Sequence, residues 1–157
     1  MELIEQRNKI LEIGCGSGNF LLSLAESYTD SQFFGIDISD WSISYAQELA
    51  NRRDLQNIQF SSGNMESLKF DDEFFDMVFA IKSFHHSFNP QKASNEAYRV
   101  LCKSGIFVLI EWAEWAQTGV PEHYFSEQEL REILQRSGFQ IVEFTIIDDE
   151  YFVVASK

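Results

Sequence analysis

The chain has 157 residues, a formal net charge of −13 at pH 7, and fifteen phenylalanines in a composition that is 45% hydrophobic. This length is typical of one domain that buries a sizeable core, and the aromatic content argues against a disordered chain. The acidic balance excludes the basic surface by which proteins bind nucleic acid or an anionic membrane. Cys15 and Cys102 lie far apart and supply neither a disulfide framework nor the spacing of metal ligands, so no metal is expected.

The N-terminal sequence "MELIEQRNK" lacks the apolar segment of a signal peptide, and no apolar run in the chain approaches the length of a membrane span. We therefore expect a cytoplasmic protein. Residues 1–157 are expected to form a single domain, with only eight or nine residues ahead of the first strand. The expected N-terminal cap over the sheet is therefore minimal.

Apolar runs typical of strands alternate with amphipathic segments typical of helices along the first two thirds of the chain. Capping residues mark the helix starts: Asp40 after the second strand, Asn89 ahead of Pro90, and Ser126 ahead of the last helix. Gly105 is expected to end the turn before the fifth strand, and the connection between the third and fourth strands holds at most a turn or two of helix. The strands predicted in this part are 10–13, 32–38, 57–63, 75–81 and 106–112.

The chain ends with "FQIVEFTIIDDEYFVVASK", which has the pattern of two strands separated only by "DDE". Three residues cannot form the crossover that parallel strands need, so these two strands must be antiparallel. The whole pattern predicts an α/β fold: a doubly wound, mostly parallel, seven-stranded sheet with helices on both faces and a C-terminal antiparallel hairpin.

Three glycines, Gly14, Gly16 and Gly18, follow the first strand at every second position. In a doubly wound sheet, ligands bind at the carboxyl ends of the strands around the first crossover, where the first helix points its free amides. The fingerprint of dinucleotide-binding proteins, G-x-G-x-x-G, requires a glycine where this chain has Asn19. The pattern is instead G-x-G-x-G, so an oxidoreductase that uses an adenine dinucleotide is only a distant alternative.

Four further motifs accompany the glycines in a specific order. "ILEIGCGSGNF", "FGIDIS", "FSSGNMESLKF" and "FDMVFAIKSFHHSFNP" resemble the successive motifs of class I S-adenosylmethionine-dependent methyltransferases. "AYRVLCKSGIFVLIEW" is similar to the small-molecule (type 11) branch that includes quinone-biosynthesis methyltransferases. The resemblance covers residues 10–157. It implies a Rossmann-like methyltransferase fold, S-adenosylmethionine as cofactor, and in-line transfer of a methyl group to a small-molecule acceptor.

The resemblance also implies which residues contact the cofactor. Asp37 would accept hydrogen bonds from the ribose hydroxyls. Asn64 stands where many relatives have an aspartate that accepts from the adenine amino group, and an amide oxygen can do the same. Ile81 and Lys82 would offer backbone carbonyls to the cofactor's ammonium group, without need of the lysine side chain. The full expected set is Glu12, Gly14, Cys15, Gly16, Gly18, Asp37, Ile38, Asn64, Met65, Ile81 and Lys82.

Some members of this set have a second interpretation. Glu12 stands in an otherwise apolar strand, where an unpaired carboxylate is costly to bury. The resemblance implies that it braces the glycine loop near the amino-acid end of the cofactor, and the alternative is a residue that faces outward. Met65 would lie against the adenine or would simply fill the core. Small size is enough to explain Cys15 between two glycines, and no catalytic role is expected for it.

His85 and His86 follow the fourth strand at the mouth of the expected site, and both are candidate catalytic residues. Methyl transfer is an in-line displacement, so holding the acceptor in place supplies much of the rate. A general base is needed only if the acceptor must lose a proton. Acceptor positioning is therefore the favoured role, with proton abstraction as the alternative.

The segment after the fourth strand partly bounds the acceptor. Enzymes that methylate bases or amides carry [Asn/Asp]-Pro-Pro-[Tyr/Phe] there, whereas this chain has "IKSF", so no nucleic-acid acceptor is expected. Trp112, Trp115, Tyr124 and Phe125, in and beside segment 113–125, would line an apolar acceptor pocket or belong to the core. The alternative to a complete enzyme is a cofactor-binding module, or a subunit whose open acceptor side is covered by a partner or by a second copy.

Overall fold

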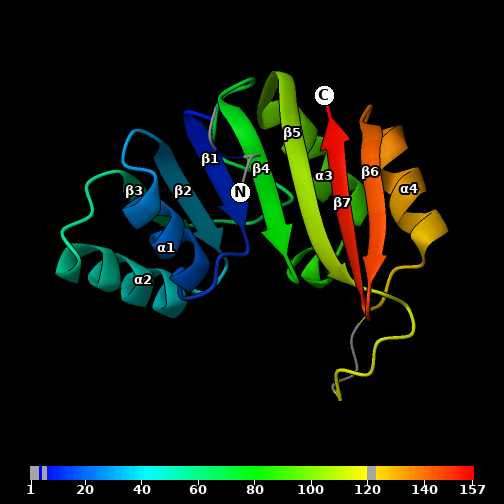
Figure 1. Cartoon of the computed structure of the whole chain (residues 1–157), viewed down its shortest axis with the longest axis horizontal. Helices are drawn as coiled ribbons and strands as arrows, with labels where there is room; N and C mark the ends of the chain where they lie inside the picture. The colour runs from blue at the N-terminus through cyan, green and yellow to red at the C-terminus, as the bar shows by residue number, and fades with distance from the viewer. Residues whose placement is uncertain (1–3, 5–6, 120–122) are drawn as a thin grey trace.

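Seven strands form one sheet in the order β3-β2-β1-β4-β5-β7-β6 (Figure 1). The structure, a computed structural model, describes residue 4 and residues 7–119 and 123–157. Strands β1 to β5 run parallel, and β7 is antiparallel to both of its neighbours, which confirms the predicted fold class. The strands are β1 (Lys9–Ile13), β2 (Gln32–Asp37), β3 (Ile58–Ser62), β4 (Phe75–Ile81), β5 (Leu101–Trp112), β6 (Gln140–Ile147) and β7 (Glu150–Ser156).

Helices cover both faces of this sheet. Helices α1 (Asn19–Ser27) and α2 (Asp40–Arg52) lie in front of β1 to β3 in Figure 1, whereas α3 (Pro90–Val100) and α4 (Glu127–Arg136) lie behind the other half. Each face has its own hydrophobic core, and neighbouring β1 residues divide between them: Ile10 packs with the α1 side and Leu11 with the α3 side. This period-two alternation fixes which side of the sheet each connection must cross. None of the described helices combines the length and the apolarity that crossing a bilayer requires.

Two of the three predicted helix caps are confirmed and one is wrong. The Asn89 side chain accepts from the Lys92 amide at 3.0 Å, and the Ser126 hydroxyl accepts from the Glu129 amide at 3.2 Å. Helix α2 is capped by Ser39, which accepts from the Ser42 amide, and not by Asp40. The reason is that β2 ends at Asp37 and Ser39 has an extended backbone, so Asp40 is already helical. Its carboxylate there is still favourable to the helix dipole.

Strand β5 begins at Leu101, earlier than its apolar run predicts. The pairing with β4 jumps from Phe75–Leu101 to Met77–Ile106, so the intervening residues bulge out of the ladder. The turn expected at Gly105 is therefore a bulge inside the strand, with Ser104 in the left-handed region at φ 67°. The C-terminal hairpin is confirmed, and its reversed strand β7 lies one position in from the edge.

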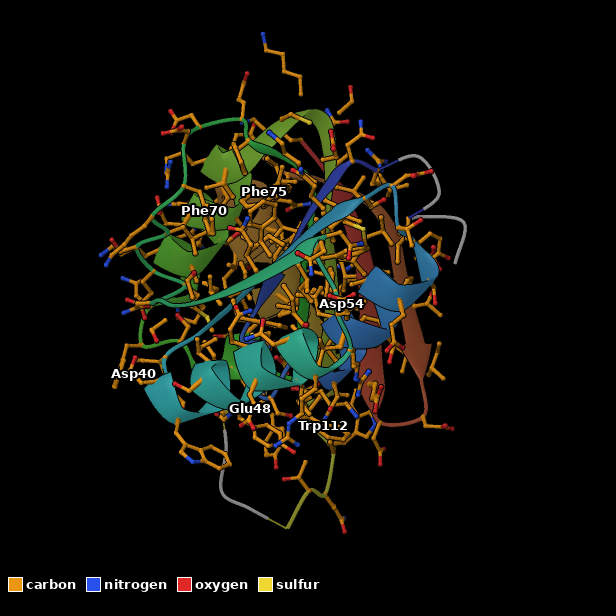
Figure 2. The ribbon with its side chains drawn as sticks, turned by 90° about the vertical axis from the view of Figure 1, so that its left-hand side faces the viewer. Asp40, Glu48, Asp54, Phe70, Phe75 and Trp112 are labelled. Carbon is orange, nitrogen blue, oxygen red and sulfur yellow. The ribbon has the colours of Figure 1, made fainter. Side chains whose placement is uncertain are left out.

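The connection between β3 and β4 contains turns and no helix, in line with the prediction. Helix α3 holds it in place: the Arg99 guanidinium donates to the Leu68 and Phe70 carbonyls at 2.9 and 2.8 Å. Glu96 accepts from the Leu68 amide at 2.7 Å. The rings of Phe70 and Phe75, labelled in Figure 2, pack edge to face at 4.8 Å. This anchoring fixes the start of the same connection, residues 63–66, at the carboxyl edge of the sheet.

Candidate functional site

A cavity of about 330 Å³ opens at the carboxyl edge of the sheet, around the ends of β1, β2 and β4. Six of the expected cofactor residues and one candidate histidine line it: Gly14, Asp37, Ile38, Asn64, Met65, Lys82 and His86. Glu12, Cys15, Gly16, Gly18, Ile81 and His85 do not line it. Seven lining residues were not predicted: Ile13, Ile36, Gly63, Glu66, Ser83, Ser87 and Phe88. All seven stand within two positions of a predicted residue, which is the signal that would have found them.

The three glycines all adopt left-handed backbone conformations, at φ 73°, 53° and 73°. A Cβ on Gly14 would lie 2.4 Å from the Cβ of Ser83, and one on Gly18 would lie 2.6 Å from the ring of Phe60. A Cβ on Gly16 would meet no heavy atom of the described residues within 4 Å. Close packing therefore explains Gly14 and Gly18, whereas Gly16 borders open space and needs glycine for its turn.

The Asp37 carboxylate holds the glycine loop. One oxygen accepts from the Gly16 amide at 2.8 Å and the other from the Ser39 amide at 2.9 Å. Each carboxylate oxygen can accept more than one hydrogen bond, and Asp37 also lines the cavity. The carboxylate is thus fixed in orientation by two backbone amides and keeps acceptor capacity for hydroxyl donors inside the cavity.

Glu12 is buried, with 5% of its surface exposed, so it does not face outward. One of its carboxyl oxygens has no hydrogen-bond partner among the described residues. Burial, with a further contribution from the charge of Asp37, raises the pKa of Glu12 to about 8. A buried carboxyl with an unsatisfied oxygen is costly, and such groups concentrate at functional sites.

Cys15 contributes by its size. Its sulfur lies so close to β2 that a Cβ on Gly35 would be only 2.9 Å from it. Burial, together with the charges of Glu12 and Asp37, raises the pKa of the Cys15 thiol far above its usual range. The thiol therefore stays protonated, in agreement with the expectation that it has no nucleophilic role.

Asn64 forms a tight turn with the residues that follow it. Its side-chain oxygen accepts from the Glu66 amide at 2.8 Å, and its carbonyl accepts from the Ser67 amide at 2.9 Å. The oxygen expected to accept from adenine therefore has one bond already, with a second lone pair and the amide NH₂ still available. Met65 packs against the core, as one interpretation expects, and it also lines the cavity, where the contact with adenine stays a prediction.

Lys82 has a left-handed backbone at φ 49°, which is uncommon for a residue other than glycine and clusters at functional sites. Its ammonium forms an ion pair with Glu150 and lies 3.7 Å from the ring centroid of Trp112, which Figure 2 labels at the lower edge of the molecule. The lysine side chain thus turns toward β5 and β7, as expected for a residue that would contribute its backbone.

The two histidines have different environments. His85 is 7% exposed, its Nδ1 lies 2.6 Å from Glu111 Oε1, and its amide donates to Glu111 Oε2 at 3.2 Å. His86 is exposed and lines the cavity. The short 3₁₀ helix η1 (Phe84–His86) turns them in these different directions. Of the two candidates, only His86 faces the cavity, whereas His85 is part of the buried structure.

Sequence reasoning missed the partner of His85. Glu111 is fully buried in β5, and its signal was a single carboxylate in the apolar run "IFVLIEW". Unpaired, it would be as costly to bury as Glu12, so a partner was required.

The aromatic residues proposed for an acceptor pocket do not line this cavity. Phe125 is fully buried against Phe84, with ring centroids 5.8 Å apart, so it belongs to the core. Trp115 packs edge-on against Tyr151, and the Tyr124 hydroxyl lies 2.5 Å from the Thr118 hydroxyl. Trp112, Trp115, Tyr124 and Phe125 are absent from the described residues that line the cavity. Part of the proposed segment, residues 120–122, lies outside the described residues.

Comparison with known proteins agrees with this geometry. A family model described as a methyltransferase domain matches residues 4–148. The sterol 24-C-methyltransferase erg6 of Aspergillus fumigatus is 32% identical over 110 residues, which cover 69% of this chain and 29% of that enzyme. The chain therefore spans less than a third of that relative's length.

Two solved structures have the same fold. A methyltransferase from Methanosarcina mazei superimposes with a TM-score of 0.88 at 23% identity, covering 99% of this chain and 95% of that one. A methyltransferase from Haloferax volcanii, solved in complex with the Trm112 methyltransferase activator, gives a TM-score of 0.81 at 20% identity, covering 95% and 82%.

The burial of Glu12 predicts a pH-dependent stability. Between the ordinary glutamate pKa of 4.5 and the raised value of about 8, the unfolded chain loses this proton and the folded chain keeps it. Ionisation of the unfolded state therefore lowers the stability of the wild type as pH rises through this window. The melting temperature of Glu12→Gln minus that of the wild type should rise steadily from pH 5 to pH 8 and then level off. The exposed Glu48→Gln is the matched control, and a gap that does not change with pH would contradict the prediction.

Proposed function

The chain belongs to the class I S-adenosylmethionine-dependent methyltransferases, and we propose that its cavity binds S-adenosylmethionine and presents the methyl group to a small-molecule acceptor. One observation carries the proposal: Gly16 borders open space while its amide is held by Asp37, a carboxylate that lines the cavity. The Asp37 carboxylate is thus held in a fixed orientation for the hydroxyls of a ribose. The backbone of Gly16 beside it is open to a ligand, because no side chain of the described residues covers it.

Two further observations support the fit of this cofactor. Glu12 stands two residues before Gly14 and has an unsatisfied oxygen, to which a cationic amino-acid end would donate. The exposed side chain of Ile38 stands beside Asn64 and Met65 on the cavity wall and supplies an apolar surface for a base. When bound, S-adenosylmethionine supplies an electrophilic methyl group on a sulfonium. Asp37 and Asn64 would orient the nucleoside, and His86 would position the acceptor at the mouth.

His86 carries a second role only for some acceptors. An acceptor that attacks with a free lone pair needs positioning alone, whereas a hydroxyl or an acidic carbon must give up a proton. Neutral imidazole is the form able to take that proton, so this role would give a rate that rises with pH through the histidine's ionisation. We propose positioning as the general role and proton abstraction as the acceptor-dependent one.

A second candidate function is a partner-dependent subunit. It is favoured by the open mouth of the cavity, where Phe88 is 98% exposed, and by the relative in Haloferax volcanii, which was solved with an activator protein. Tight cofactor binding without turnover over a broad panel of small acceptors would favour this candidate. The cytoplasmic location, the single domain over residues 1–157 and a homo-oligomeric state remain predictions.

The first test of the proposal is ligand identity. Calorimetry with S-adenosylmethionine, its demethylated product and NAD should show affinity of about micromolar for the first two and none for NAD. The physical reason is the position of the third glycine. The start of α1 packs against the Phe60 ring of β3 at Gly18, where a Cβ would clash. The dinucleotide fingerprint needs its third glycine at position 19 instead. Binding of NAD without binding of the methyl donor would overturn the proposal.

The second test is the contact between Asp37 and the ribose. Asp37→Ala should weaken binding of S-adenosylhomocysteine by about 1.5–3 kcal/mol, the range for hydrogen bonds to a charged group. Because Asp37 also holds the Gly16 and Ser39 amides, part of this loss will come from the loop. The 2′,3′-dideoxy analogue separates the two effects. Its deficit relative to the parent ligand should be large in the wild type and nearly absent in the variant. An equal deficit in both proteins would place the ribose elsewhere.

The third test concerns the open space at Gly16. Asparagine tolerates the left-handed region better than most residues, so Gly16→Asn should fold and should fill the space with a side chain. We expect it to lower cofactor affinity at least about 100-fold while unfolding cooperatively, as measured by calorimetry and thermal melting. Gly119→Asn is the matched control, because Gly119 also has a positive φ, 79°, and a Cβ there would meet no heavy atom of the described residues within 4 Å. Normal cofactor binding by a folded Gly16→Asn protein would show that the loop faces something else.

A further inference from the structure

The Glu66 carboxylate crosses from the connection after β3 to the loop after β4. The Ser87 hydroxyl and the Asn89 amide both donate to its Oε1, at 3.1 and 3.0 Å. The Asn89 amide is the main reason that the pKa of Glu66 lies below its usual range, so the group is an anion at any working pH. Glu66 and Ser87 both line the cavity. One side chain therefore ties two cavity walls that lie more than twenty residues apart in sequence.

The backbone of Glu66 also bonds to Asn64, the residue expected to bind adenine and called the adenine seat below. The Glu66 amide donates to the side-chain oxygen of Asn64 at 2.8 Å, and the next residue closes the turn onto the Asn64 carbonyl. A ligand that bonds the Asn64 side chain therefore acts on the same turn that holds Glu66. The adenine seat is therefore connected to the loop after β4 through one turn and one carboxylate.

The first half of that loop has its own anchors. The Ser83 hydroxyl donates to the Ile13 carbonyl at 2.7 Å, and Glu111 holds both the ring and the amide of His85. The second half is tied across the cavity by Glu66. Between and beyond these anchors stand two exposed ring side chains of the loop, His86 and Phe88. The position of both depends on where the segment from Ser87 to Asn89 is held.

We propose that Glu66 is a positioning residue that couples occupancy of the adenine seat to the order of the acceptor-side loop carrying His86 and Phe88. Ligand binding that stiffens the Asn64 turn stiffens the loop through the carboxylate, and the loop then needs less ordering when the acceptor arrives. Cofactor binding and acceptor binding therefore favour each other. The proposal rests on the proposed function, because it requires an adenosine ligand in this cavity.

The amides of Phe88 and Asn89 report on the coupling without any acceptor. S-adenosylhomocysteine is the probe, and amide hydrogen exchange is followed by NMR in the full chain. In the wild type, the ligand should slow exchange at these two amides at least about tenfold, together with protection at Glu66 and Ser67. In Glu66→Ala, protection at Glu66 and Ser67 should persist, whereas Phe88 and Asn89 should change less than about twofold.

Two further variants make the result specific. Glu66→Gln keeps a side-chain oxygen that accepts from Asn89 and should restore most of the protection at the loop. Glu132→Ala removes a carboxylate of α4 that bonds within its own helix, at the far edge of the sheet in Figure 1, and should behave as the wild type. Calorimetry should give the same affinity for S-adenosylhomocysteine in Glu132→Ala as in the wild type, and exchange is measured with every protein saturated by the ligand.

The possible results distinguish failure of the coupling from failure of the proposed function. Equal protection of Phe88 and Asn89 in wild type and Glu66→Ala would overturn the coupling and leave the proposed function intact. Binding to the wild type with no protection at these amides would do the same. No binding of S-adenosylhomocysteine to the wild type would overturn the proposed function and the coupling with it. Loss of loop protection in Glu66→Ala, with its return in Glu66→Gln, is the supporting result.

Discussion

The bond between the Asp37 carboxylate and the Gly16 amide is the contact on which the site depends. Three left-handed glycines at every second position would otherwise make a flexible segment. The end of β2 holds this segment by hydrogen bonds. The Asp37 carboxylate accepts from the Gly16 amide, and the Ile36 carbonyl accepts from the amides of Gly14 and Cys15 at 2.8 and 2.9 Å. These bonds hold the loop in place before any ligand arrives, and α1 begins after Gly18 without a side-chain cap.

The charges around the cavity explain which ligand suits it. Asp37 and Glu66 are carboxyls that line the cavity, in a chain whose net charge is −13. The lysine of the cavity wall, Lys82, has its charge engaged by Glu150. Such surroundings oppose a dinucleotide, which brings an anionic pyrophosphate, and favour a sulfonium compound, which brings one net positive charge. The missing dinucleotide glycine and the electrostatics thus favour the same cofactor for independent reasons.

The elements that sequence predicts well here are those set by neighbours in the chain. The "DDE" hairpin, the Asn89 cap and the Ser126 cap each depend on a few consecutive residues, and all three appear as predicted. The contacts missed by sequence depend on distant segments that fold together: Glu66 with Asn89, and His85 with Glu111. The two histidines look equivalent in sequence, and only the 3₁₀ turn and a carboxylate from β5 decide which one is buried. A solitary charged residue in an apolar strand was the one available signal.

This division also bears on how the site is built. The cofactor side is made of backbone and short side chains fixed by strand ends, so it tolerates little change. The acceptor side is a short loop held by carboxylates from two other elements, Glu111 at one end and Glu66 at the other, with His86 and Phe88 exposed between and beyond them. Because both of these side chains are exposed and lie outside the two hydrophobic cores, they are free to vary without loss of the fold. Acceptor specificity is therefore expected to reside in His86 and Phe88, and cofactor specificity in the loop that Asp37 holds.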